Sequence, residues 1–236
     1  MFDLIAFDAD DTLWHNEIHY ERMAEILCDF LKPYCTAAET ERHLYETEMR
    51  NLPLYGYGTK GFMLSVIETA IQVSSGKIES RSINQLIQFG HEMLAQNIEL
   101  LPHVPETLDK LSSEHILMVI TKGDLFDQEA KLARSGIAHY FQHTEIVSDK
   151  SQQKYQELLA KYGVDPAQFL MTGNSLKSDV MPVASLGATA VHIPYAITWL
   201  HEVDHHADTV QQNHFRLEHM GQLPDLIRTL QNGSAS

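Results

Sequence analysis

Three carboxylates and a hydroxyl gather directly after a short apolar run near the start of the chain. The run is Leu4–Phe7, and Asp8, Asp10, Asp11 and Thr12 follow it. Such a run predicts a buried strand, and alternate side chains of an extended chain share one side, so Asp8 and Asp10 can face one pocket. Ordinary turns also use Asp, but they do not need three acids in four positions beside a Thr. Because neighbouring carboxylates repel, the pattern predicts a cation site at a strand's carboxyl end, where open α/β sheets bind ligands.

Three later segments end apolar runs in the same way. They are residues 121–123, 148–150 and 173–179. Taken alone, each is typical of an ordinary connection from a strand to a helix, and a Lys after a strand is more often a surface residue. The carboxyl ends of parallel strands meet at one edge of a sheet, so four such segments in one chain predict a shared site.

At these positions the sequence resembles the haloacid dehalogenase-like hydrolases, and among them the phosphatases with a helical cap inserted after the first motif. That motif is an Asp, any residue, a second Asp, then Gly or Asp and Thr; residues 8–12 match it. The second, an apolar strand ending in Ser or Thr, is matched by residues 117–121. The third is a Lys near a helix start, matched best by Lys150, with Lys154 as the alternative. The resemblance spans nearly the whole chain.

The resemblance implies a phosphoryl-transfer site built from these residues. It implies that Asp8 is the nucleophile that forms an aspartyl-phosphate, and that Asp10 protonates the leaving alcohol and then serves as base toward water. Thr121, the Lys122 backbone N–H and Lys150 would hold the oxygens of the phosphoryl group. Asp11 is expected to be a turn residue without direct chemistry.

The fourth motif carries the one departure from the family pattern. Asn174 stands where the family commonly has an acid, whereas Asp179 retains the second acid. An amide oxygen brings no charge, so we expect Asn174 to support the metal from its outer shell, with a weaker effect than an acid. The resemblance implies Mg²⁺, which prefers oxygen ligands, bound by Asp8, the carbonyl of Asp10, and Asp179.

The elements that must position these residues follow the pattern of an interrupted α/β protein. Apolar periodicity predicts helices between residues 17 and 100, whereas short apolar runs alternate with helices after Pro102 and indicate βαβ units. We therefore expect a three-layer, Rossmann-like parallel sheet core of residues 1–14 and 101–232, an inserted all-helical cap of residues 15–100, and a flexible tail of residues 233–236. The predicted helices are 17–31, 37–50, 62–73, 82–100, 104–111, 125–135, 152–162 and 180–186; the predicted strands are 4–7, 116–120, 145–147, 169–171 and 188–193.

Composition narrows the function further. The 236-residue chain is 44% apolar and has a formal net charge of −15, which argues against a nucleic-acid partner. No basic leader and no long apolar stretch is evident, so we expect a cytoplasmic protein without a membrane partner. The oligomeric state is left open. Cys28 and Cys35 flank Pro33 and are expected to be reduced, because a spacing of seven positions on a helix places them too far apart for a disulfide.

Two sequence features resemble binding sites, one for a dinucleotide and one for zinc, but their surroundings argue against both functions. Residues 56–61 spell a dinucleotide-binding G-x-G-x-x-G, but a helix rather than a strand is expected before them, and Pro53 is expected to break that helix. A turn between cap helices is the alternative, in which a loop carrying Tyr55, Tyr57 and Lys60 could face the crevice and select substrates. A zinc site from three clustered histidines is disfavoured, because neither the usual spacing nor an apolar shell is evident; they are His201, His205 and His206.

The sequence thus predicts a Mg²⁺-dependent phosphatase that acts on a small phosphorylated metabolite. A nucleotide, a sugar phosphate or a flavin phosphate would each fit. A hydrolytic dehalogenase of the same superfamily also uses an Asp nucleophile but lacks the second Asp, so Asp10 argues against it. A phosphomutase uses the same two Asp residues and stays open. A non-catalytic ligand-binding protein that kept the fold also stays open, with Asn174 as the only residue that favours it.

Overall fold

The computed structural model describes residues 2–197 and 214–233, and they divide into two compact units. Unit 1 comprises Met1–Glu17, Ile98–Thr121 and Lys131–Ser236; unit 2 comprises Ile18–Asn97 and Lys122–Ala130. The sequence pattern placed the helical insertion at residues 15–100. The structure adds to that helical unit a segment that follows a strand of the sheet, which no periodicity in the sequence indicated.

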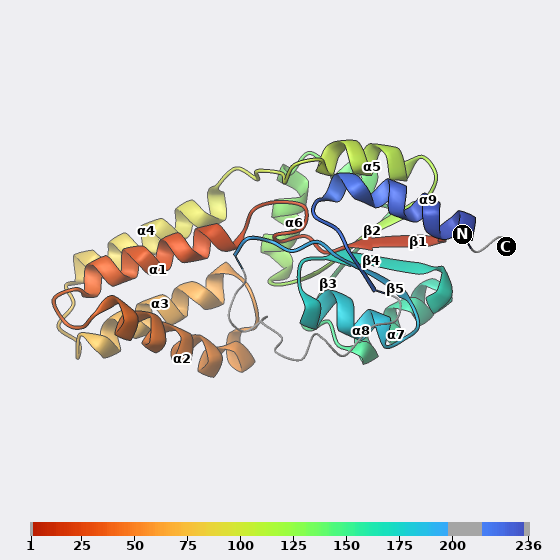
Figure 1. The fold of residues 1–236 in the computed structure, drawn as a ribbon. Coiled ribbons are helices and arrows are strands. Elements are labelled where there is room, and N and C mark those ends of the chain that lie inside the picture. The colour runs from red at the N-terminus through yellow and green to blue at the C-terminus, as the bar shows by residue number, and fades with distance from the viewer. Residues whose placement is uncertain (1, 198–213, 234–236) are drawn as a thin grey trace. The chain divides into compact units, whose positions relative to one another are not determined.

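A six-stranded sheet forms the centre of unit 1 (Figure 1), in the order β3-β2-β1-β4-β5-β6. Strand β1 pairs in parallel with β2 and β4, and β5 pairs in parallel with β4 and β6. Five of the strands were expected from apolar runs, whereas β6 was not, because it carries no apolar run: two of its three residues are partly buried and the third is exposed. The strands are β1 (Leu4–Phe7), β2 (Ile116–Lys122), β3 (His143–Val147), β4 (Phe169–Gly173), β5 (Thr189–His192) and β6 (His214–Arg216).

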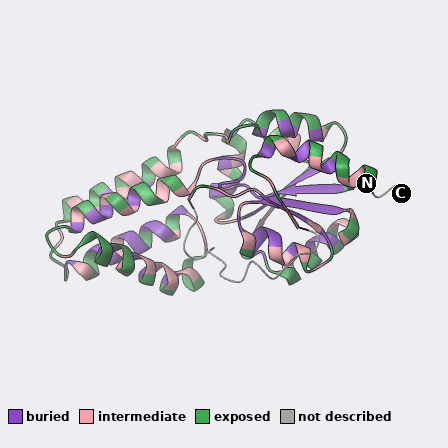
Figure 2. Cartoon of the chain, viewed as in Figure 1, coloured by how far each residue is buried: buried purple, intermediate pink, exposed green. Residues whose placement is uncertain are grey.

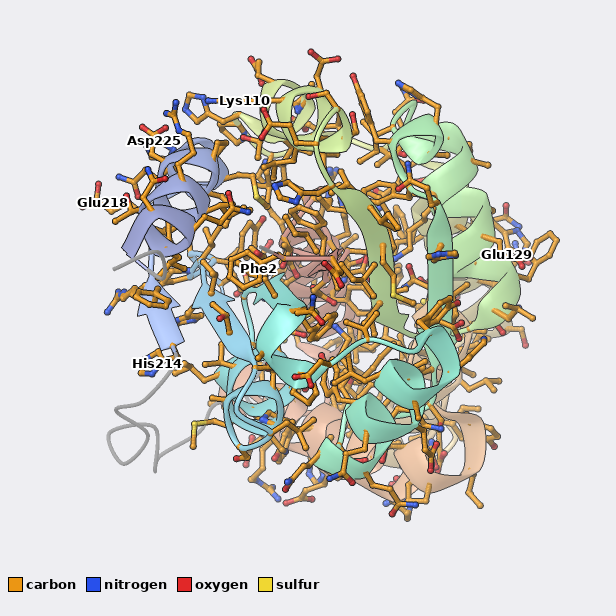
Figure 3. The ribbon with its side chains drawn as sticks, turned by 90° about the vertical axis from the view of Figure 1, so that its right-hand side faces the viewer. Phe2, Lys110, Glu129, His214, Glu218 and Asp225 are labelled. Atoms are coloured by element: carbon orange, nitrogen blue, oxygen red, sulfur yellow. The ribbon has the colours of Figure 1, made fainter. Side chains whose placement is uncertain are left out.

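Helices cover both faces of this sheet, and the strands are its most buried part (Figure 2). Helices α5 (Val104–Ser112) and α9 (Leu223–Gly233) pack beside each other, as Lys110 and Asp225 illustrate in Figure 3. Their apolar residues share one core cluster with β1 and β2, and those of α7 (Gln152–Tyr162) and α8 (Met181–Ala184) share a second with β1 and β4. The predicted three-layer α/β fold is therefore confirmed.

Four helices make up most of unit 2. They are α1 (Glu17–Leu31), α2 (Ala37–Tyr55), α3 (Thr59–Val73) and α4 (Ser80–Ala95). Their apolar faces form a separate core that includes Leu27, Leu44, Val66 and Leu86. Thr36 starts α2 with a capping box, in which its side chain and that of Glu39 each accept the other's backbone N–H. The unit has its own core, as an inserted domain requires.

Several expected boundaries were wrong for local reasons. Helix α2 continues through Pro53 to Tyr55, because a proline this close to the end removes only one backbone bond, and Gly56 N–H still reaches the carbonyl of Leu52. Helix α4 ends at Ala95 instead of Leu100, which bridges Trp14. The helix expected at residues 180–186 is divided into a π-helical turn, Leu176–Val180, and α8.

The remaining expectations on organisation have mixed outcomes. Gly233 belongs to α9, and the rest of the expected tail lies outside the described residues. Cys28 and Cys35 are both free thiols. None of the helices in the described part of the chain combines the length and the apolar character that a membrane span requires. His201, His205 and His206 lie outside the described residues.

Candidate active site

A buried ion cluster lies at the carboxyl edge of the sheet in unit 1. Asp8 leaves β1 with its backbone N–H donating to the carbonyl of Thr172 on β4, at 2.9 Å. The Lys150 ammonium donates to Asp8 Oδ1 and also to Asp179 Oδ1, the latter at 2.7 Å. The three residues are 7%, 4% and 1% exposed, respectively. The site thus brings together the ends of three separate segments around one cation.

The electrostatics of this cluster depend on that cation. Burial raises the pKa of Asp8 to about 7, although the Lys150 ammonium opposes the rise. Burial alone would lower the pKa of Lys150, but the carboxylates of Asp179 and Asp8 raise it above its ordinary value. Lys150 therefore stays charged, and an additional cation beside Asp8 would favour the ionised form that a nucleophile needs.

Thr12 links the first and fourth segments. Its hydroxyl lies 3.1 Å from Asp8 Oδ2 and 3.2 Å from Asn174 Oδ1, and its oxygen accepts the backbone N–H of Asn174 at 3.1 Å. A hydroxyl has one proton, so it donates to one of these oxygens at a time. Asn174 is therefore linked to Asp8 through the hydroxyl of Thr12.

Asp179 is held by the tight turn that follows β4. Its Oδ2 accepts the backbone N–H of Ser175 at 3.0 Å, and its own N–H donates to the Ser175 carbonyl at 2.8 Å. The carboxylate crosses directly over Gly173, where an added Cβ would lie 2.2 Å from Oδ2. Only glycine allows this close approach. The Gly at the start of the fourth motif is thus required by packing against the acid at its end.

Asp10 has a different set of partners from Asp8. The indole Nε1 of Trp14 donates to Asp10 Oδ1 at 2.7 Å, and the Lys131 ammonium donates to Oδ1 and Oδ2 at 2.7 and 3.0 Å. Lys131 also donates to Asn16 Oδ1 at 3.1 Å. Asp8 and Asp10, which are two positions apart in the motif, are therefore each paired with a different lysine.

Sequence reasoning missed Lys131 and Trp14. Lys131 lies on α6 (Leu125–Arg134), ten residues after Thr121, where no family motif directs attention. The burial of this helix is inverted relative to its polarity, which appears only in the structure. Leu125 and Phe126 are 59% and 75% exposed, whereas the polar side of the helix is buried at Asp127, Gln128 and Lys131. A polar stripe on the buried side of a helix indicates that those groups have polar partners.

Asp11 lies in the turn after β1, as expected, and has a structural role there. It adopts a left-handed conformation with a φ of 61° and accepts the backbone N–H groups of Asn16 and Glu17 at the start of α1. Burial raises the pKa of Asp11 to about 7, against the lowering effect of these two N–H groups. The third acid of the motif therefore stabilises the start of α1.

The expected phosphate-binding residues fall in different units. Thr121 is 3% exposed at the end of β2 in unit 1, and Lys150 lies in the ion cluster. Lys154, the alternative, pairs instead with Glu157 on the exposed side of α7 at 2.7 Å. Lys122 belongs to unit 2, where its Nζ lies 4.4 Å from the centre of the Tyr57 ring.

Of the three residues expected on a substrate-facing loop, only Tyr57 lies between helices. Tyr55 is the last residue of α2 and 51% exposed, and Lys60 is the second residue of α3. The expectation of a shared loop was wrong because α2 runs past Pro53. Lys60 forms an ion pair with Asp124 at 2.7 Å, within unit 2.

The residues present fit a magnesium ion. Asp8 and Asp179 both contact one ammonium, so a single cation can touch both carboxylates, and the side chains of the cluster other than Lys150 supply only oxygen. Mg²⁺ binds through one or two carboxylates and completes its shell with water and substrate oxygens. No group of three or more acidic, His or Cys side chains with metal-binding geometry occurs among the described residues, and Mg²⁺ does not need one. Asp8, Asp179 and the Asp10 carbonyl would hold it.

Comparison with known proteins places this site in a family context. A family model described as haloacid dehalogenase-like hydrolase matches residues 2–187. The chain is 28% identical over 103 residues to a glyceraldehyde 3-phosphate phosphatase of Methanothermobacter thermautotrophicus. That alignment covers 41% of this chain and only 46% of the relative's length.

Solved structures extend the likeness to the whole chain. A haloacid dehalogenase-like hydrolase from Xanthomonas campestris is 33% identical, with a TM-score of 0.87 over all of this chain and 95% of that one. A 2-haloacid dehalogenase from Pseudomonas syringae is 21% identical, with a TM-score of 0.62 over 98% of this chain and all of that one. The second likeness shows a shared fold only.

Proposed function

Because the chain belongs to the haloacid dehalogenase-like hydrolase family, we propose that this hydrolase is a Mg²⁺-dependent phosphatase of small phosphomonoesters. Asp10 is the observation that carries the proposal. It gives the site a second carboxylate, two residues after Asp8 and separately anchored. A phosphatase needs that group to move a proton to the leaving alcohol, whereas dehalogenation expels a halide that needs none.

The reaction proceeds through two displacements at phosphorus. In the first, an Asp8 carboxylate oxygen forms a bond to phosphorus while the bond to the leaving oxygen breaks, and Asp10 gives that oxygen its proton. In the second, water attacks the aspartyl-phosphate, Asp10 takes up the water's proton, and the Asp8–phosphorus bond breaks to release phosphate. Splitting the hydrolysis in this way replaces one difficult step with two easier ones.

The charged groups of the site support both displacements. Bound Mg²⁺ supplies positive charge that neutralises the phosphoryl oxygens as charge redistributes. Lys150 offers a buried, permanently charged donor beside Asp8, and Thr121 adds a hydroxyl at the end of β2. In a chain with a net charge of −15, these local groups must capture an anionic substrate against the overall field.

The order of candidate substrates is based on a partial relative. The partial relative in Methanothermobacter acts on a triose phosphate by its name, so short sugar phosphates come first, followed by nucleotides and flavin phosphates. Selection by Tyr55, Tyr57 and Lys60 is part of this proposal. A cytoplasmic location and a lack of nucleic-acid partners also stay predictions.

A substrate panel tests the proposal. Purified protein is assayed for phosphate release from triose, pentose and hexose phosphates, nucleotides and an aryl phosphate, with Mg²⁺ or with EDTA, beside the Asp8→Asn variant. We expect release that needs both Mg²⁺ and Asp8. Chloride release from 2-chloro acids without phosphatase activity would establish the dehalogenase instead. Isomeric phosphates formed in place of free phosphate would establish the phosphomutase, and binding of a phosphate ester without turnover would establish the non-catalytic protein.

A further inference from the structure

Lys131 is a buried lysine whose contacts converge on one carboxylate. Its side chain is 9% exposed, and its ammonium donates to both oxygens of Asp10 and to Asn16 Oδ1. A lysine ammonium has three protons, and three acceptors lie within 3.1 Å of it. Buried lysines are rare unless they are paired, since desolvation of the charge is costly. The burial of Lys131 is thus explained by its contacts with the Asp10 carboxylate and the Asn16 side chain.

Asp10 is held from a second direction by Trp14. That indole is 1% exposed, packs in the core cluster between the sheet and α5, and donates to Asp10 Oδ1 at 2.7 Å. A fully buried aromatic ring in a close-packed core cannot change its position freely. The Asp10 side chain nevertheless keeps 22% of its surface exposed, so another molecule can approach it. Asp10 is therefore anchored firmly while one part stays accessible.

We propose that Lys131 is a positioning residue that holds Asp10 in place for proton transfer to and from the reacting oxygens. This inference rests on the proposed phosphatase function. Lys131 acts through Asp10, and it supplies a positive partner for the carboxylate that remains after the proton has gone to the leaving oxygen. General acid–base catalysis contributes about 10²–10⁴-fold, and a misplacement of about 1 Å can remove roughly 10²-fold. Lys131 is thus a further residue of the site, located on a helix outside the four motifs.

Leaving groups of different basicity separate positioning from a structural effect. The Lys131→Met variant keeps the side-chain length but loses the ammonium. For a phosphate ester of a simple alcohol, whose leaving oxygen needs a proton, we expect kcat/KM to fall by about 10²-fold, because kcat/KM covers the steps up to loss of the alcohol and not the later attack of water, which both esters share. For 4-nitrophenyl phosphate, whose leaving group needs no proton, we expect kcat/KM to fall by less than about tenfold. Lys131→Arg should recover much of the loss, because a guanidinium also donates twice to a carboxylate.

A double-mutant cycle identifies the group through which Lys131 acts. In an Asp10→Asn background, we expect Lys131→Met to cause no further loss of kcat, because the positioned carboxylate is already absent. A role in folding alone would instead multiply the two losses. Lys161→Met is the matched control, since Lys161 is an exposed lysine that pairs with Glu145, and it should keep the wild-type kcat. If Lys131→Met does not fold, Lys131→Gln takes its place in the same cycle.

The outcomes distinguish this inference from the function on which it rests. If the wild type turns over but Lys131→Met lowers kcat/KM equally for both esters, or if the losses in the cycle multiply, positioning by Lys131 is overturned and the phosphatase function stays intact. Wild-type protein that releases no phosphate from any ester would overturn the proposed function itself. A selective loss for the alkyl ester that vanishes in the Asp10→Asn background supports the inference.

Discussion

Lys150→Met is expected to destabilise the protein strongly in the absence of metal and to make its stability depend on Mg²⁺. The substitution keeps the length of the side chain but removes the ammonium that donates to Asp8 and Asp179. The side chains of Asp8 and Asp179 are only 10% and 1% exposed, so water cannot replace the lost partner without a rearrangement. The change leaves two acids close together with no lysine between them.

The magnitude follows from the burial of this cluster. Removing one partner of a buried ion pair costs about 3–5 kcal/mol, because the other charge remains unpaired. The cost should shrink as the pH falls. Burial already raises the pKa of Asp8 to about 7, and loss of Lys150, which opposes that rise, raises it further. Folding raises the pKa of this carboxyl group from 3.8, so its protonated form stabilises the folded protein at low pH. This contribution is fully present below the unfolded pKa and is lost as the pH rises through the folded pKa.

Urea unfolding in EDTA at pH 5 and pH 8, with and without Mg²⁺, measures these effects. At pH 8 we expect the variant to lose ~3–5 kcal/mol relative to the wild type, with a smaller loss at pH 5. If Mg²⁺ takes the place of the ammonium, a concentration 100 times its dissociation constant restores ~2.7 kcal/mol. Lys154→Met, at an exposed ion pair on α7, should stay within ~0.5 kcal/mol of the wild type. Equal midpoints for Lys150→Met and wild type in EDTA at pH 8 would refute the ion cluster.

Four further substitutions test other parts of the account. Asp8→Asn should lower kcat by at least ~10³-fold in the phosphate-release assay while circular dichroism stays that of the wild type, and retained turnover would exclude Asp8 as nucleophile. Gly173→Ala places a Cβ 2.2 Å from an oxygen of Asp179, so calorimetry should show Mg²⁺ affinity reduced by ~10-fold or more; unchanged affinity would argue against Asp179 as a ligand. Asn174→Asp adds a charge beside the cluster and should tighten Mg²⁺ binding while lowering stability in EDTA, and calorimetry with weaker binding would contradict the outer-shell role. Glu48→Gln removes a partly buried carboxyl group whose pKa desolvation raises to about 7, so the variant should gain ~1–3 kcal/mol in urea at pH 8 and nothing at pH 4; a gain that is equal at both pH values would show another cause.

The carboxyl edge of the sheet could be predicted because it follows from the parallel direction of the strands. Apolar runs identified the strands, and parallel strands must deliver their last residues to one edge. Asp8, Lys150 and Asp179 therefore came out together, although they lie far apart in the chain. The pairing of Lys150 with both acids follows from side-chain chemistry, since two buried carboxylates need a cation between them.

Contacts that arise from helices and from the folded arrangement could not be predicted in the same way. Lys131 reaches Asp10 from the second turn of α6, and nothing in a single sequence says which acid a buried lysine will meet. The grouping of residues 122–130 with the helical unit depends on specific pairs such as Lys60 with Asp124. Helix α2 passed its proline because the break costs one bond, which the local pattern did not reveal.

The central claim is that the Asp8 carboxylate attacks phosphorus, and the stereochemical course of hydrolysis tests it most directly. A phosphorothioate ester whose phosphorus carries two different oxygen isotopes is hydrolysed in water labelled with the third isotope, and the configuration of the released thiophosphate is determined. Each in-line displacement inverts the configuration at phosphorus, so two displacements through Asp8 predict net retention. Net inversion would show that water attacks the substrate directly, and it would contradict the account.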